Sequence, residues 1–176
     1  MIVDGKYFGG SLEDLNVARA VTNFPLLRKD FIINEYQLIE AKAHGADVIL
    51  LIASVLTREE IKKLSTFAQS LGLEVLLEVH NLEELEKSIM PSLDIFGVNN
   101  RNLKTFEVDL NTSRTLVEKI PTDFVKISES GISDSAAILD LKTYGFEGFL
   151  VGENFMKTNN PGASAAAFIK EIEDEA

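Results

Sequence analysis

The amino-acid sequence predicts a single α/β domain over residues 1–176, in which short buried strands alternate with amphipathic helices. Two observations lead to this prediction. Six short apolar runs recur along the chain, and the stretches between them carry helix start and stop signals. The alternation repeats about every 20 to 30 residues, which is typical of strand–helix units on a parallel sheet.

The predicted strands are short, and the second is the most apolar. The stretch around it, Val48–Leu56, is interrupted only by Ser54, and its length and β-branched residues suit a strand buried on both faces. It is far shorter than the roughly 20 residues that a membrane-spanning helix needs. In order, the six runs are Pro25–Leu27, Asp47–Ala53, Glu74–Val79, Ile95–Val98, Phe124–Ile127 and Gly148–Val151.

Seven helices are expected around these strands, because capping residues mark their ends. In the helix that begins after Asn34, we expect Tyr36, Ile39 and Ala43 to line the apolar face, with Leu38 on its flank. A short helix is expected to follow Gly152. The other start signals are Ser11 with Asp14, Thr57 with Glu60, Asn81 with Glu84, Ser133 and Pro161, and the glycines that end helices are Gly45, Gly72 and Gly145.

The composition excludes several classes of protein. The chain has no cysteine, which excludes disulfides, a thiolate nucleophile and any Cys-ligated metal, and fits a reducing compartment such as the cytoplasm. Its net charge of −11 argues against nucleic acid and against an anionic membrane surface as partners. No spacing of histidines or carboxylates suggests a metal site, so no metal is expected.

Polar side chains recur at the carboxyl ends of the predicted strands, where parallel α/β folds place their chemistry. Lys29 directly follows the first strand and could donate a proton or hold an anion, or it could be solvated or paired with Asp30. Glu78 lies inside the apolar third strand. It could act as a general base or bind a cation, or it could form a structural salt bridge.

The remaining strand ends suggest an anion site. Asn99 and Arg101 follow the fourth strand, where they could orient a carboxylate or a hydroxyl, or simply shape the turn. The fifth strand runs through Ser128–Ser133 into a helix, and the sixth continues into Gly152–Asn154. Two such glycine-bearing turns on the last two strands match the usual phosphate site of a (β/α)8 barrel.

Six sequence blocks, in order, resemble the indole-3-glycerol-phosphate synthase family. These blocks are KYFGGS at Lys6–Ser11, LRKDFII at Leu27–Ile33, LEVH at Leu77–His80, NNRNLKTF at Asn99–Phe106, SESGI at Ser128–Ile132 and VGENFM at Val151–Met156. The resemblance extends from about residue 6 to the end of the chain. It implies a (β/α)8 (TIM) barrel that closes the indole ring of 1-(2-carboxyphenylamino)-1-deoxyribulose 5-phosphate, with loss of carbon dioxide and water, in tryptophan biosynthesis.

The resemblance also implies a role for each site residue. Lys29 would be the general acid near the substrate carbonyl, Glu78 and Glu129 would handle protons, and Asn99 would orient the substrate. The substrate-binding residues would be Phe8, Phe31, Leu50, Ile52 and Arg101, and the phosphate-binding residues would be Ser130, Gly131, Gly152 and Glu153. No cofactor is implied. Asn154 stands where members of this family often have serine, so a side-chain contact to phosphate is not expected there.

The chain has 176 residues, whereas the family, like barrels in general, runs to about 250 residues. The resemblance places the first strand and most of the second before Met1, leaving an incomplete barrel of six parallel strands. We expect the exposed edges near Pro25 and Gly148 to be covered by a second copy, by a separate N-terminal segment or by a rearranged terminal segment, and the isolated chain to be impaired. The alternatives are a non-catalytic barrel fragment that binds a phosphate ester, and another phosphosugar barrel enzyme such as phosphoribosylanthranilate isomerase.

Overall fold

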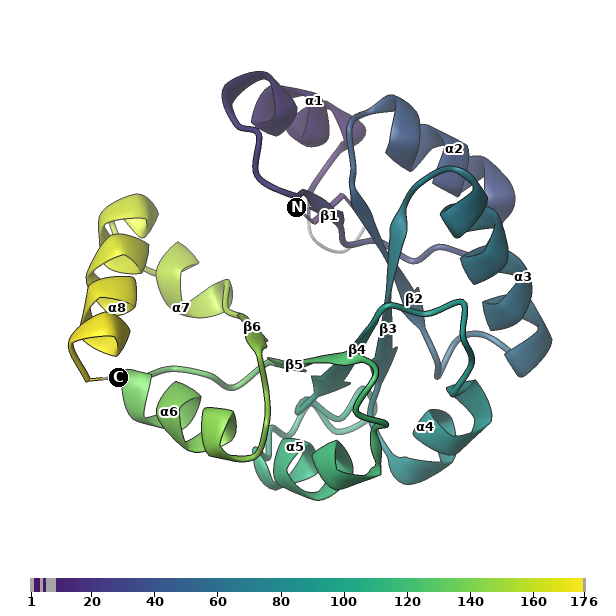
Figure 1. The fold of residues 1–176 in the computed structure, drawn as a ribbon. Coiled ribbons are helices and arrows are strands. Elements are labelled where there is room, and N and C mark those ends of the chain that lie inside the picture. The colour runs from purple at the N-terminus through teal and green to yellow at the C-terminus, as the bar shows by residue number, and fades with distance from the viewer. Residues whose placement is uncertain (1, 4, 6–8, 176) are drawn as a thin grey trace. The chain divides into compact units, whose positions relative to one another are not determined.

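The structure is a computed structural model that describes residues 2, 3, 5 and 9–175 (Figure 1). The chain divides into two compact units. The first consists of Met1–Val79 with Glu83–Phe96, and the second consists of His80–Leu82 with Gly97–Ala176. None of the helices among the described residues is long and apolar enough to cross a membrane.

All six predicted strands are confirmed, and they follow one another in the sheet in chain order. The strands are β1 (Leu27–Arg28), β2 (Val48–Ile52), β3 (Glu74–Val79), β4 (Ile95–Asn99), β5 (Val125–Glu129) and β6 (Gly148–Leu150). Two strands differ most from the prediction: β5 begins at Val125 and continues to Glu129, and β1 excludes Pro25 and continues to Arg28. A proline has no N–H to donate to a neighbouring strand, so the regular pairing begins after it.

In the first unit, β1, β2 and β3 pair in parallel, with Arg28 opposite Ile49 and Ile52 opposite Glu78. The helices are α1 (Leu12–Val21), α2 (Glu35–Ala43), α3 (Arg58–Ser70) and α4 (Leu82–Ser88), and α2 and α3 lie side by side in Figure 1. Every residue of β2 is buried. Because neighbours in register point to the same face, Leu50, Ile52 and Glu78 share one face of this sheet.

The predicted apolar face of α2 is wrong. Leu38 and Ala41 are its buried residues, whereas Tyr36 is 67% exposed, Ile39 is 49% exposed and Ala43 is also exposed. Leu38 and Ala41 are three residues apart and therefore lie on one side of the helix, which is its buried side. The predicted set also shares a face, but that face points outward.

The edge of β1 is partly covered by residues of the same unit. Ile2 forms an isolated parallel bridge with Lys29, and the backbone N–H of Val3 donates to the carbonyl oxygen of Lys29 at 3.0 Å. These two contacts place Ile2 and Val3 alongside β1. They also mean that the edge near Pro25 is less open than the sequence suggests.

In the second unit, β5 and β6 pair in parallel, with Glu129 opposite Leu150. The helices are α5 (Asn111–Leu116), α6 (Ser135–Thr143), α7 (Glu153–Met156) and α8 (Pro161–Glu175), and a 3₁₀ turn, Val117–Lys119, follows α5. Helix α5 was not predicted. Helix α6 begins after Asp134 rather than Ser133, because the Asp134 carboxylate accepts a hydrogen bond from the backbone N–H of Ala137 at 2.8 Å.

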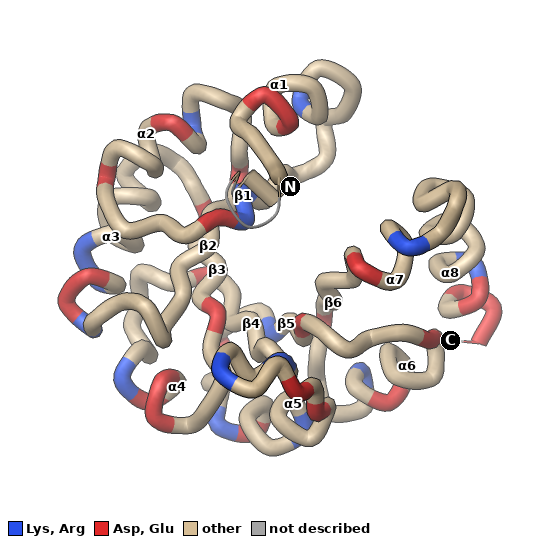
Figure 2. The backbone as a smooth tube through the Cα atoms, turned by 180° about the vertical axis from the view of Figure 1, so that it is seen from behind, with Lys and Arg blue, Asp and Glu red and all other residues tan. Residues whose placement is uncertain are grey.

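The surplus of acidic residues is partly located at helix starts. The first turns of α1, α2, α3, α4 and α7 carry Asp or Glu, and Figure 2 shows acidic residues, in red, on helices of both units. Negative side chains are favourable at these positions because the N-terminal end of a helix carries a partial positive charge. The charge of −11 therefore includes carboxylates that stabilise helices.

Candidate active site

The first group of candidate residues lies at the carboxyl ends of β1 and β3, within the first unit. Lys29 Nζ donates to Glu78 Oε2 at 2.9 Å. The Glu78 side chain is only 4% exposed, whereas that of Lys29 is 31% exposed. Asp30, the partner that the sequence analysis considered for Lys29, is instead bonded to Arg28. A buried carboxylate that holds a partly exposed ammonium group can take part in proton transfer.

The residues around this ion pair can form an apolar wall. Leu50 and Ile52 are buried on the same face of the sheet as Glu78. Phe31 follows Lys29 by two residues and is 40% exposed, so its ring is accessible to a ligand. Phe8, the other aromatic residue that the resemblance implies, lies outside the described residues.

The second group lies at the ends of β4 and β5, within the second unit. Asn99 and Glu129 are both buried, with exposed fractions of 8% and 2%. The Asn99 side-chain oxygen accepts from the backbone N–H of Arg101 at 3.0 Å, so Asn99 also shapes the turn, as the alternative interpretation proposed. The two strand ends are joined directly, because the Asn100 N–H donates to the carbonyl oxygen of Glu129 at 2.9 Å.

A buried polar network supports this second group, and the sequence interpretation missed it. The Asn100 side-chain amide donates to Ser128 Oγ and to the carbonyl oxygens of Glu129 and Ser130, at 3.0 to 3.1 Å. Its oxygen accepts from the Ser113 N–H, and the hydroxyls of Ser113 and Ser128 are 2.8 Å apart. The sequence signal that could have revealed this network is the polar pair Asn99-Asn100 at the end of a predicted strand.

The turn after β5 has an unusual backbone. Ser130 and Gly131 have φ values of +67° and +75°, in the left-handed region. A Cβ atom on Gly131 would lie 2.2 Å from Cγ1 of Val108, so this position requires glycine. The turn therefore places Ser130 directly after the buried Glu129, in a conformation that few side chains adopt.

The turn after β6 lies beside the turn after β5. Gly152 precedes α7, and the Asn154 side chain donates to the carbonyl oxygen of Ser133 at 3.0 Å, which links the two turns. The Glu153 carboxylate binds Lys157 and also Arg101, whose Nη2 is 2.9 Å away. The Lys157 ammonium, together with the Arg101 guanidinium, lowers the pKa of Glu153 below its ordinary value.

The structure therefore brings the predicted site residues into two groups. Lys29, Glu78, Leu50, Ile52 and Phe31 belong to the first unit. The second unit holds Asn99, Arg101, Glu129, Ser130, Gly131, Gly152 and Glu153. Among residues 2, 3, 5 and 9–175, no cluster of three or more histidine or carboxylate side chains could hold a metal ion.

Solved structures with the same fold include several enzymes. The 3-hexulose-6-phosphate synthase of Salmonella typhimurium matches with a TM-score of 0.77 at 14% identity, over 99% of this chain and 86% of that one. A tryptophan synthase alpha-subunit from Pyrococcus furiosus matches with a TM-score of 0.69 at 16% identity, over 93% and 72%. These matches confirm the predicted α/β fold of the TIM-barrel class.

Sequence comparison is more specific. The protein of Bacteroides thetaiotaomicron named indole-3-glycerol phosphate synthase is 50% identical over 173 residues, which are 98% of this chain and 66% of that protein. The protein of the same name from Aquifex aeolicus is 47% identical over 92% of this chain and 63% of its own length. The chain thus spans about two thirds of the length of these relatives. The indole-3-glycerol phosphate synthase family matches residues 1–170, and the chain belongs to this family.

Proposed function

We propose that this chain carries the catalytic residues of an indole-3-glycerol phosphate synthase, a carboxy-lyase of tryptophan biosynthesis. The ion pair between Lys29 and the buried Glu78 is the observation that best supports the proposal. The substrate is 1-(2-carboxyphenylamino)-1-deoxyribulose 5-phosphate. In the reaction, a carbon–carbon bond closes the indole ring, the carboxylate leaves as carbon dioxide and the former carbonyl oxygen leaves as water.

In this proposal, Lys29 is the general acid. As the ring carbon attacks the substrate carbonyl, the ammonium group donates a proton to the carbonyl oxygen. The adjacent Glu78 carboxylate favours the charged form of Lys29, which is the form that can donate. Glu129 acts as the second carboxylate and stabilises the positive charge that develops on the ring nitrogen, while Asn99 orients the substrate.

The aromatic ring of the substrate is proposed to bind against Phe31, Leu50 and Ile52, with Phe8 as a further contact. The phosphate is proposed to bind the backbone N–H groups at Ser130, Gly131, Gly152 and Glu153. Two observations support this placement: the Asn154 bond holds the two turns together, and the Glu153 carboxylate is bonded to Lys157 and Arg101. Arg101 donates to Glu153 through Nη2, and the other N–H groups of its guanidinium are proposed to bind substrate.

The proposal is tested by following indole fluorescence as the purified 176-residue chain is mixed with the substrate. We expect slow turnover that disappears in Lys29→Ala and persists in the control Lys63→Ala, whose side chain is 69% exposed. An unchanged rate in Lys29→Ala would remove Lys29 from the mechanism. The chain spans 66% of its relatives' length, and this favours one second candidate, a fragment that binds the phosphate ester without converting it. Binding of the substrate without fluorescence change would favour that candidate.

We infer that the edges of the sheet are covered in solution, either by a second copy of this chain or by an N-terminal segment. Among the described strands, β6 is last in the sheet and pairs with β5. Light scattering tests the first possibility, since a monodisperse monomer would exclude self-association. We also propose a cytoplasmic location, because the absence of cysteine fits a reducing compartment.

A further inference from the structure

We propose that Arg28, Asp30 and Gln37 are positioning residues that fix the segment Phe31–Asn34 and thereby hold the Phe31 ring in place for substrate. The inference rests on the proposed function, in which Phe31 contacts the aromatic ring of the substrate. It concerns the opposite face of β1 from Lys29. Successive side chains of a strand point to opposite faces, and Arg28 accordingly contacts α2 while Lys29 contacts Glu78.

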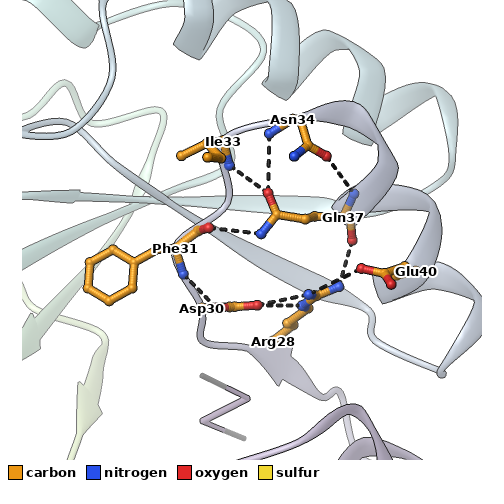
Figure 3. A network of polar contacts seen from close by, with 7 residues as sticks. All are labelled: Arg28, Asp30, Phe31, Ile33, Asn34, Gln37 and Glu40. Atoms are coloured by element: carbon orange, nitrogen blue, oxygen red, sulfur yellow. Dashed lines mark hydrogen bonds and ion pairs between the residues drawn. The ribbon is translucent and has the colours of Figure 1, made fainter. Parts of the chain in front are cut away.

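Arg28 is the centre of this network, which Figure 3 shows. Its side chain is 4% exposed. Nε and Nη2 donate to Asp30 Oδ2 at 3.2 and 2.8 Å, and Nη1 donates to the carbonyl oxygen of Gln37 at 2.7 Å. Glu40 Oε2 lies 3.6 Å from Nη2. Arg28 therefore ties the residue after Lys29 to the first turn of α2.

The side chains of Asp30 and Gln37 in turn bind the backbone of the segment. Asp30 Oδ1 accepts from the N–H of Phe31 at 2.8 Å, and Gln37 Nε2 donates to the carbonyl oxygen of Phe31 at 2.9 Å. Gln37 Oε1 also accepts from the N–H groups of Ile33 and Asn34, at 2.9 and 3.2 Å. Both backbone groups of Phe31 are thus held by side chains, and Figure 3 shows its ring pointing away from the network.

A purely structural role explains only part of this arrangement. Gln37 belongs to the capping box of α2, which accounts for its bond to Asn34 but not for its bond to Phe31. A buried ion pair such as Arg28 with Asp30 adds little stability, since apolar side chains of similar volume often stabilise equally well. Apolar side chains, however, cannot bind the backbone groups of a segment that has no regular secondary structure. The network provides these bonds directly beside Lys29.

The first test measures amide hydrogen exchange by NMR in the full 176-residue chain, without ligand. Arg28→Met and Gln37→Met are expected to speed exchange at Phe31 and Ile33 about tenfold, while β2 and β3 stay unchanged. Arg114→Met is the matched control, because Arg114 Nε and Nη2 bind Asp140 Oδ2 in the same way in the second unit. Unchanged exchange at Phe31 and Ile33 would overturn the proposal. If Arg28→Met does not fold, Gln37→Met alone decides.

The second test is a double-mutant cycle on affinity for indole-3-glycerol phosphate, followed by indole fluorescence. Gln37→Met is expected to weaken binding about tenfold in the parent chain and less than about twofold in a Phe31→Leu background, because Gln37 acts through Phe31. Equal losses in both backgrounds would overturn the proposal. If the parent chain does not bind, the proposed function fails instead. The network is then judged on exchange alone, where faster exchange confined to residues 31–34 supports it and unchanged exchange overturns it.

Discussion

Replacing Lys29 by methionine separates the two interpretations of Glu78, a catalytic carboxylate or half of a structural salt bridge. The substitution keeps most of the length of the side chain and removes its charge. The Glu78 carboxylate, 4% exposed, then loses the ammonium group 2.9 Å away. A carboxylate in a low-dielectric environment without this counter-charge raises the free energy of the folded state.

The size of the effect follows from the geometry. Two unit charges 2.9 Å apart attract by about 6 kcal/mol at an effective dielectric constant of 20, before desolvation is subtracted. Removing one partner of a fully buried pair typically costs about 3 to 5 kcal/mol. Lys29 is 31% exposed, and solvent screens its charge, so we expect Lys29→Met to destabilise the fold by about 2 kcal/mol. Replacing both residues by methionine should recover most of this loss.

Urea unfolding measures the stability part of the prediction, and the expected change corresponds to a shift of the midpoint by about 1 M. Lys63→Met serves as a control, because Lys63 forms an exposed ion pair with Glu35 at 3.4 Å and its loss should change little. Turnover should be absent in both the single and the double variant. The reasoning is refuted if the double variant is less stable than Lys29→Met, or if it regains turnover.

Three further substitutions, with Gly145→Ala as a reference, test the second unit. Asn100→Ala should cost about 2 to 3 kcal/mol in urea unfolding, because it removes the partners of several buried groups. Gly131→Ala should destabilise the fold clearly more than Gly145→Ala, because only at Gly131 would a new Cβ have an atom within 4 Å. Gly145→Ala should cost about 1 kcal/mol, from backbone conformation alone. Equal losses of stability would contradict this reasoning. Glu153→Gln should lower stability near neutral pH. Lys157 is the main cause that lowers the folded-state pKa of Glu153 below 4.5. The contribution of the Glu153 carboxylate to stability is therefore present above pH 4.5 and is lost as the pH falls through the folded-state pKa. Acid unfolding of the parent chain and of Glu153→Gln measures this difference.

The strand–helix order could be predicted because each element has a local signal. The caps at Ser11 and Thr57 and the unbroken apolar run of β2 identify their elements without tertiary information. Helix α5 was missed because it begins after Leu110, which makes no side-chain capping bond, and ends in a 3₁₀ turn after six residues. The buried face of α2 was also wrong, because two apolar faces compete on that helix and only the packing of the unit decides between them.

The candidate site could also be predicted only in part. Lys29 and Glu78 were identifiable because a charge inside or beside an apolar run is costly unless it is paired. That they pair with each other depends on the register of β1, β2 and β3, which single residues do not reveal. Asn100 and Arg28 escaped the sequence interpretation for a related reason. Asparagine in a turn and arginine after a strand are ordinary on a surface, and only their burial, 2% and 3% exposed, makes them significant.

The direction of Lys29 depends on a strand of only two residues, and that strand needs external anchors. A shift of one residue in β1 would turn Lys29 toward α2 and Arg28 toward Glu78, since successive side chains alternate. Leu26 prevents this shift: its N–H donates to Asp47 Oδ2 at 2.8 Å, and its carbonyl oxygen accepts from the N–H groups of Asp47 and Val48. On the other side of β1, the N–H of Val3 binds the carbonyl oxygen of Lys29 itself. The backbone around Lys29 is therefore fixed from both sides, which allows the next residues, through Arg28 and Gln37, to be held by side chains alone.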